Sequence, residues 1–190
     1  ELGVPSTLIA SALFARYISA YKKERLQANE DFSIEPSALN LEIDAVLKGY
    51  QFARIINHYQ GFKLISEASK AYSWSMNLSE IARIWTNGCI IKSDFMVELI
   101  SVLKETDNIL TYNTIIDELK SLKSSINIVV SECILNELAV PCLSESVNFL
   151  NAFVTANSSA NIIQAQRDYF GAHTYQRTDD TSRKAYHTNW

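Results

Sequence analysis

The chain is poor in the residues that interrupt helices. Only 5 glycines and 3 prolines occur in 190 residues, well under the average usage of roughly 7% and 5%. The glycines lie far apart, so the chain lacks the Gly-rich turn between a strand and a helix with which dinucleotide-binding domains hold a pyrophosphate. Few turns and no strand-like alternation predict an all-α fold of long helices, without a nucleotide-binding unit.

Other absences exclude further classes of protein. The formal net charge of -4 and the pI near 5.4 argue against a nucleic-acid-binding domain, which would carry a basic face. No apolar run reaches the length of a membrane span, and no signal-peptide pattern occurs. The 3 cysteines are an odd number without metal-like spacing. We therefore expect reduced thiols in a cytoplasmic protein, and no metal site.

The remaining composition is typical of one compact domain. Hydrophobic residues make up 47% of the chain and charged residues 20%, and a chain of this length can bury a sizeable core. We predict a single large helical domain over residues 1–172, followed by an extended tail over residues 173–190. The tail mixes aromatic and polar residues without a helical period. So high an aromatic content needs a surface to pack on.

Apolar residues at helical spacing place the individual helices. We predict helices over about 5–29, 39–71, 78–85, 94–106 and 113–138. The second of these is apolar nearly all round, which is typical of a central, buried helix. Gly49 and Gly61 lie inside it, and we expect another backbone to approach closely at both.

Two short segments of the chain resemble each other in sequence. Leu138-Ala139-Val140-Pro141 resembles Leu2-Gly3-Val4-Pro5, and an apolar helix follows each segment. We interpret this resemblance as an internal duplication, with a helical unit packed on its copy. A long helix precedes the second copy but not the first, and the chain starts at Glu1 without a methionine. We therefore expect a piece cut from a longer protein, with its amino-terminal part missing.

Arg16 is the first candidate binding residue. At about 100° per residue it falls within about 20° of Ile9, on the apolar side of the first predicted helix. A guanidinium there is costly unless it is paired. Arg16 should therefore either meet a carboxylate of another helix or face a site that receives an anion.

The run from Asn161 to Asp179 supplies two more candidates. Arg167 and His173 flank a helix end expected near Gly171, where an arginine fork and an imidazole can together hold an oxyanion such as phosphate. Cations near a helix C-terminus with glycine as the stop are equally typical of an ordinary helix end. Spacing alone does not decide between the two.

Residues 163–178 resemble the C-terminal signature of decarboxylating 6-phosphogluconate dehydrogenases. Further segments resemble the same family in the same order: Leu2-Gly3-Val4-Pro5, Phe14-Ala15-Arg16-Tyr17, Tyr59-Gln60-Gly61-Phe62, Ile81-Ala82-Arg83-Ile84-Trp85, Gly88-Cys89-Ile90-Ile91 and His187-Thr188-Asn189-Trp190. The resemblance covers nearly the whole chain. The chain departs from the family pattern at Thr86-Asn87, at Lys92 and over the segment from Gln27 to Asn40.

The resemblance implies an activity of the pentose phosphate pathway. In this family NADP oxidises the 3-hydroxyl of 6-phosphogluconate, the keto acid loses carbon dioxide, and the enediol is protonated to ribulose 5-phosphate without a metal. The Rossmann domain that binds NADP and the catalytic lysine and glutamate would lie before Glu1. No catalytic residue is therefore expected in this chain, and no cofactor-binding residue can be named.

The resemblance also assigns three substrate-binding residues. Arg16 matches the family's phosphate-binding arginine, which favours an anion site over an ion pair. Arg167 and His173 match the pair that reaches the substrate of the neighbouring subunit, with Arg167 clamping the phosphate and His173 donating a hydrogen bond. Family members form dimers whose tail threads through the partner, so residues 173–190 are expected to pack on a second copy.

Two other hypotheses stay open. The chain can be a non-catalytic helical interaction module that kept the fold and the self-associating tail, or part of a related 3-hydroxyacid dehydrogenase. An intact Gly-rich turn and a Lys/Glu pair upstream would favour an enzyme over the module. Arg16, Arg167 and His173 together favour a phosphorylated substrate over another hydroxy acid.

Overall fold

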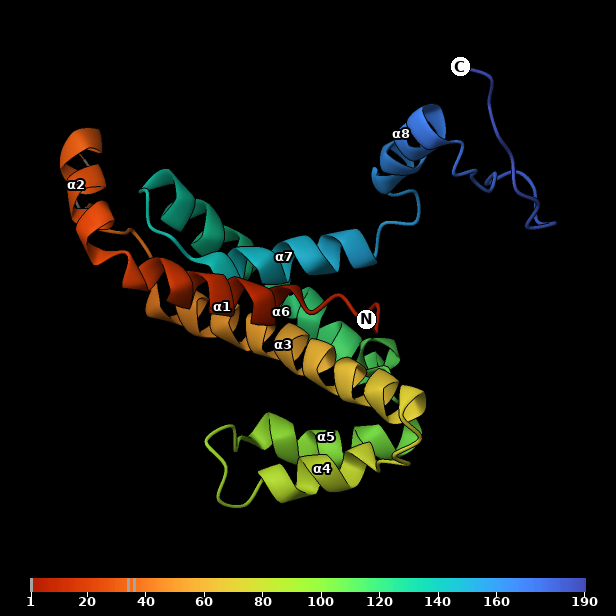
Figure 1. The fold of residues 1–190 in the computed structure, drawn as a ribbon. Helices are drawn as coiled ribbons and strands as arrows, with labels where there is room; N and C mark the ends of the chain where they lie inside the picture. Colours follow the sequence, from red (N-terminus) through yellow and green to blue (C-terminus); the bar gives the residue numbers. More distant parts are fainter. Residues whose placement is uncertain (1, 34, 36) are drawn as a thin grey trace. The chain divides into compact units, whose positions relative to one another are not determined.

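The computed structural model describes residues 2–33, 35 and 37–190 (Figure 1). Glu1, on which the expected truncation rests, and Ile34 and Pro36 of the divergent segment lie outside the described residues. The described residues form eight α-helices: α1 (Thr7–Ala20), α2 (Lys22–Phe32), α3 (Ile43–Ala71), α4 (Leu78–Trp85), α5 (Asp94–Glu105), α6 (Asn113–Leu135), α7 (Pro141–Phe153) and α8 (Ala160–Gly171). A short 3₁₀ helix, η1 (Ile109–Thr111), precedes α6. The predicted all-α fold is confirmed.

The chain divides into two compact units, Glu1–Leu150 and Asn151–Trp190, and each is described by itself. The first unit holds α1 to α6 and most of α7, and the second holds α8 and the segment after it. The division at residue 172 into a substrate-binding domain and a tail stays a prediction, as does the internal duplication.

The core of the first unit forms where α3 and α6 run along each other (Figure 1). Both helices bury the apolar rows that their sequences predict, and the fully or almost fully buried residues include Phe52, Ile55, Ile56 and Phe62 of α3 and Ile115, Leu119, Leu122 and Ile126 of α6. The prediction of a central, buried helix is confirmed for α3 from Phe52 onward. Nearer its start, Val46 and Tyr50 are exposed because less of the unit covers that end.

The two glycines of α3 behave differently. A Cβ atom at Gly49 would lie 3.3 Å from the side chain of Ile126 and 3.5 Å from its Cα atom. The small residue therefore lets α6 come close, as predicted. A Cβ atom at Gly61 would meet nothing within 4 Å. The prediction at Gly61 is wrong, because the described residues place no neighbour against that side of the helix.

The helix pair α4 and α5 begins at two side-chain caps. The Asn77 side chain accepts a hydrogen bond of 3.2 Å from the N–H of Glu80, and the Ser93 hydroxyl accepts one of 3.2 Å from the N–H of Met96. Gly88, with φ of +77°, lies in the loop between the helices. Both predicted starts are confirmed, and the caps fix where the loop of residues 86–93 leaves α4 and enters α5.

The first predicted helix is wrong in its length. Tyr21 leaves the helical region, with φ of -81° and ψ of 50°, so that α1 ends at Ala20 and α2 starts at Lys22. The polar sequence of α2 buries no residue, so no packing holds the two helices in one line. Only Leu8 of α1 is buried, and the predicted apolar face is open, with Ile9 44% and Leu13 43% exposed.

Candidate functional site

The predicted end of α8 near Gly171 is confirmed. Ala172 takes the left-handed conformation, with φ of 48°, and its N–H donates to the carbonyl of Asp168 over 2.9 Å. Gly171 keeps helical geometry, and a Cβ atom there would lie 2.8 Å from the imidazole ring of the exposed His173, which would have to move aside. In this conformation the absence of a side chain at Gly171 lets the His173 ring lie close to the helix end.

Asp168 holds the segment after α8 against that helix. Its side chain is completely buried and accepts four hydrogen bonds. Oδ1 accepts from the N–H of Thr174 (2.9 Å) and from Nδ1 of His187 (3.0 Å). Oδ2 accepts from the N–H of Thr188 (3.0 Å) and from Nε1 of Trp190 (3.2 Å). A single carboxylate thus ties both ends of the tail to α8.

The four donors also decide the charge state of this carboxylate. Burial by itself raises the pKa of Asp168, but the hydrogen bonds from His187, Thr188, Trp190 and Thr174 outweigh it and lower the pKa from 3.8 to about 2. Asp168 is therefore an anion at neutral pH. One feature of the sequence indicates that Asp168 needs hydrogen-bond partners. An acidic residue in the last turn of a helix opposes the helix dipole and therefore needs another partner.

Within its own unit the tail forms a small folded structure. Tyr175 and Tyr186 form an antiparallel bridge, with N–H to carbonyl distances of 2.9 and 2.8 Å. The hydroxyl groups of Tyr175 and Thr188 lie 2.6 Å apart. The aromatic residues of the tail thus have partners inside this unit, and the expected packing on a second copy stays a prediction.

Arg167 and His173 both lie exposed near the end of α8. Arg167 Nη1 donates one long hydrogen bond of 3.4 Å to Oε1 of Gln164. The His173 ring packs edge-to-face with Phe170, with ring centroids 6.1 Å apart. Among the described residues the two side chains share no hydrogen bond, so the structure places them in one unit without joining them. Most of their donors are available to a ligand.

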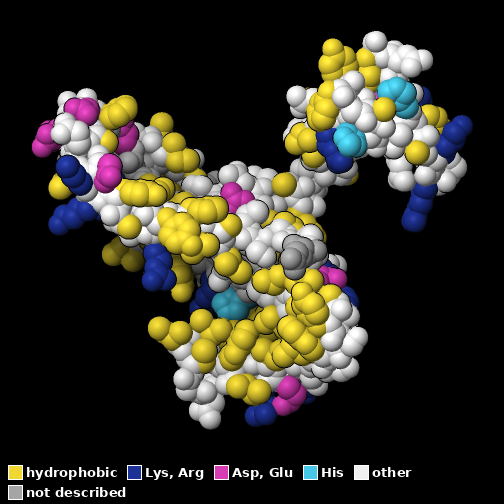
Figure 2. Space-filling model, in the orientation of Figure 1, with side chains coloured by type: hydrophobic (Ala, Val, Ile, Leu, Met, Phe, Trp, Pro, Cys, Tyr) yellow, Lys and Arg dark blue, Asp and Glu magenta, His cyan; other side chains and the backbone are white. Residues whose placement is uncertain are grey.

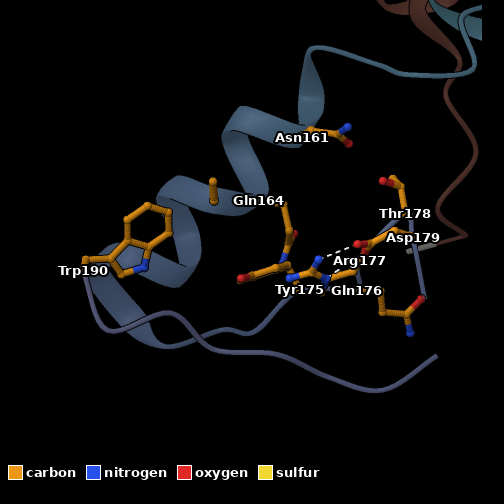
Figure 3. A pocket seen from close by; sticks show the side chains of 9 residues that line it. Asn161, Gln164, Tyr175, Gln176, Arg177, Thr178, Asp179 and Trp190 are labelled. Carbon is orange, nitrogen blue, oxygen red and sulfur yellow. Dashed lines mark hydrogen bonds and ion pairs between the residues drawn. The ribbon is translucent and has the colours of Figure 1, made fainter. Parts of the chain in front are cut away.

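A cavity of about 570 Å³ lies beside α8 in the same unit (Figure 3). It is lined by Asn161, Gln164, Ala165, Tyr175, Gln176, Arg177, Thr178, Asp179 and Trp190. Its size is in the range of about 300–1,000 Å³ that is typical of ligand pockets. Arg177 points to Asp179 and binds its carboxylate through Nε (2.8 Å) and Nη2, so its charge is already paired. Neither Arg167 nor His173 lines this cavity.

Arg16 lies on α1 in the first unit. It is exposed, and no carboxylate of the described residues forms an ion pair with it. Its carbonyl accepts a hydrogen bond of 2.6 Å from the hydroxyl of Ser19. The structural ion pair that its position on the helix allowed is therefore not formed within this part of the chain.

Gln60 is a positioning residue that the sequence analysis missed. It is fully buried in α3, where Oε1 accepts the N–H of Leu8 over 3.0 Å and Nε2 donates to the hydroxyl of Thr7 over 2.9 Å. It thereby fixes the start of α1, the helix that carries Arg16. An amide within the apolar run of α3 was the available signal, because a buried amide needs partners.

The matches to known proteins cover the whole chain. Residues 1–190 match the family model described as 6-phosphogluconate dehydrogenase, C-terminal domain. The decarboxylating 6-phosphogluconate dehydrogenase of Haemophilus influenzae is 37% identical over 199 residues, covering 100% of this chain and 41% of the relative. The NAD(+)-dependent, decarboxylating enzyme of Bacillus subtilis is 37% identical over 199 residues, covering 99% of this chain and 42% of the relative. The chain thus spans about two fifths of the length of these relatives.

A solved structure gives the same result for the fold. The 6-phosphogluconate dehydrogenase of Plasmodium falciparum matches with a TM-score of 0.90 and 32% sequence identity, over 99% of this chain and 42% of that one. That enzyme was solved in its apo form, in complex with its cofactor NADP+ and in complex with its substrate 6-phosphogluconate.

Proposed function

This chain belongs to the family of 6-phosphogluconate dehydrogenase C-terminal domains, and on that premise we propose that it is part of an enzyme that oxidises 6-phospho-D-gluconate with NADP. The products would be ribulose 5-phosphate, carbon dioxide and NADPH. The observation that carries the proposal is the match of the family model to all 190 residues. The hydride transfer and the proton transfers would be performed by residues outside this chain, and the chain alone would be inactive.

The role proposed for the chain is to bind the substrate phosphate. Arg16 would pair with the phosphate of the substrate in its own subunit. Arg167 would clamp the phosphate of the substrate in the neighbouring subunit, to which His173 would donate a hydrogen bond. Their exposure supports this, as do the absence of an ion pair at Arg16 among the described residues and the single long hydrogen bond of Arg167. Such binding can lower the barrier by fixing the reacting carbon against the nicotinamide.

A second proposed role is to form a homodimer in which the tail of one copy packs on the other. Large apolar side chains are exposed along α1, among them Leu13, Phe14, Tyr17 and Ile18, and Figure 2 shows hydrophobic side chains gathered there. On α8, Ile162, Ile163, Tyr169 and Phe170 are also exposed. Apolar surface of this extent is typical of an interface.

NADP is the cofactor that we propose, bound mainly by sequence outside this chain. The Plasmodium falciparum enzyme binds NADP+, whereas the Bacillus subtilis relative is NAD(+)-dependent. The coenzyme preference is therefore best measured directly.

We place the enzyme in the cytoplasm, in keeping with three cysteines that are all free. Within the part of the chain that the structure describes, we find no helix with both the length and the apolar character of a membrane span.

The test is an activity measurement on the intact parent protein supplied with 6-phosphogluconate and NADP. We expect NADPH absorbance and carbon dioxide to appear together. NADPH without carbon dioxide would indicate a related 3-hydroxyacid dehydrogenase, and neither signal would favour a non-catalytic dimerisation module.

A variant of the parent protein tests the assigned site. Arg167→Ala should weaken substrate binding by about tenfold or more, because it removes a charge-assisted hydrogen bond. Arg183→Ala is a matched control, because this exposed arginine lies in the tail outside the proposed site. An unchanged KM in Arg167→Ala would overturn the assignment.

A further inference from the structure

A second cavity, of about 290 Å³, lies in the first unit between α3 and the loop that leads into α5. Arg54 and His58 of α3 line it, together with Lys92 and Ser93 of the loop. None of these residues belongs to the substrate site proposed above. The cavity combines two cationic side chains with an apolar wall.

Arg54 is a half-buried cation that forms no ion pair within the part of the chain that the structure describes. Its guanidinium carbon lies 5.9 Å from the centroid of the Tyr50 ring and 5.8 Å from that of Phe95, so two aromatic faces hold it in place. Its Nε atom is buried and has no hydrogen-bond partner, and no carboxylate of the described residues forms an ion pair with it. A buried donor on a cation is costly unless an acceptor reaches it.

His58 supplies a hydrogen-bond acceptor, whereas Arg54 supplies donors. Its Nδ1 lies 2.7 Å from the carbonyl oxygen of Arg54. Because a carbonyl only accepts, Nδ1 must carry the proton. In the neutral ring Nε2 is then an acceptor, and this atom is buried without a partner. The residue is only 9% exposed, and its ring packs edge-to-face with Phe95, with centroids 5.5 Å apart.

The electrostatics keep this ring neutral. Burial lowers the pKa of His58, its hydrogen bond to the Arg54 carbonyl offsets part of the effect, and the charge of Arg54 lowers the pKa again. The cavity is therefore lined by two cationic residues and by a neutral imidazole whose Nε2 acceptor is buried. A ligand that satisfies both must carry negative charge and a hydrogen-bond donor.

The start of α5 adds positive charge beside the cavity. Lys92 is exposed beside the cavity, and Ser93 caps α5, a helix of 12 residues whose first N–H groups and dipole favour an anion. Asp94 in the first turn opposes this in part, but it is exposed and does not line the cavity.

We propose that this cavity binds a small oxyanion that bears a hydroxyl group, of which monohydrogen phosphate is the simplest. Arg54 and Lys92 pair with its charged oxygens, and its hydroxyl donates to Nε2 of His58. The volume suits an ion of this size with a short attached group. Sulfate carries the same charge but no hydroxyl at neutral pH, so the site should distinguish the two.

The test is a titration of the full chain with inorganic phosphate and with sulfate, followed by calorimetry and by the NMR signal of the His58 Nε2 atom. Phosphate should bind and shift that signal, and sulfate should bind about tenfold more weakly because it leaves Nε2 unsatisfied. Glycerol phosphate tests whether the source is a free or an esterified phosphate. Equal binding of sulfate and phosphate would refute the role of His58.

Variants separate this cavity from other anion sites. Lys92→Met and Arg54→Gln should each weaken phosphate binding by about tenfold, with thermal unfolding used to confirm that the chain still folds. Because Lys92 is exposed, its variant keeps the test valid if Arg54→Gln fails to fold. Lys104→Met, at the other end of α5, and Arg167→Ala should leave the His58 shift unchanged. If phosphate produces no His58 shift, or if Lys92→Met leaves its affinity unchanged, the proposal is wrong.

Discussion

The two units are held together in opposite ways. The first unit buries a large set of apolar side chains between α3, α6 and their neighbours. The second unit, all of whose residues are described, buries only Asp168. Stability in the first unit is spread over many apolar contacts. In the second it is concentrated in one carboxylate and four donors, which makes that unit sensitive to single changes and to acid.

The largest expected effect comes from the apolar core. Ile56→Ala removes a completely buried side chain and should lower the free energy of unfolding by about 2–5 kcal/mol. Ile43→Ala, at the exposed start of the same helix, should change it by less than about 0.5 kcal/mol. Urea unfolding followed by circular dichroism measures both. Similar losses in the two variants would contradict the core described here.

Asp168→Asn should release the tail while leaving the core intact. The amide keeps the shape of the side chain but removes the charge and places a donor where an acceptor is needed. We expect the amides of Thr174 and Thr188 to exchange hydrogen at least about tenfold faster. Asp179→Asn is the control, because its carboxylate is exposed and its ion-pair partner among the described residues is Arg177. Unchanged exchange in Asp168→Asn would show that the tail is held by other contacts.

Acid should act on the second unit in a defined window. The pKa of Asp168 is about 2 in the folded chain and 3.8 ordinarily, so the carboxylate stabilises the tail fully above about pH 4. This stabilisation is lost as the pH falls toward about 2, when the buried group takes up a proton. The indole N–H signal of Trp190 reports it by NMR. The signal should titrate in the native chain and stay flat over that window in Asp168→Asn.

The smallest effect is expected at the junction of α8 and the tail. Ala172 has φ of 48°, a conformation that glycine adopts without steric cost. Ala172→Gly should therefore stabilise the second unit by about 0.5–1 kcal/mol, measured by amide exchange. Ala165→Gly, inside the same helix, should destabilise it by a similar amount. A loss of stability in Ala172→Gly would mean that the methyl group contributes packing.

The contrast between the units also explains which features the sequence predicts. The apolar rows of α3 and α6 and the caps at Asn77 and Ser93 follow from local rules, because each depends on residues within one or two turns. The break at Tyr21 was missed because helical propensity continues across it, and only the lack of packing partners shows that the helix is free to stop there.

The candidate site depends more on contacts between distant residues. The sequence placed Arg167 and His173 beside the end of α8, and the structure agrees. The sequence did not indicate that Asp168 would accept hydrogen bonds from residues as distant along the chain as Trp190, 22 residues away. The sequence also could not predict that Arg54 Nε and His58 Nε2 are buried without hydrogen-bond partners among the described residues. Burial beside a cavity is a property of the folded chain.

The position of the Asp168 donors has a consequence for biosynthesis. His187, Thr188 and Trp190 are made after α8 is complete, so the ribosome delivers the helix before three of the four groups that donate to its buried carboxylate. Until those residues emerge, only the N–H of Thr174 and water can donate to the carboxylate, and the second unit cannot close. Chains truncated between Thr174 and Tyr186 would therefore carry a folded first unit and an open second one, a state that chaperones and proteases can reach.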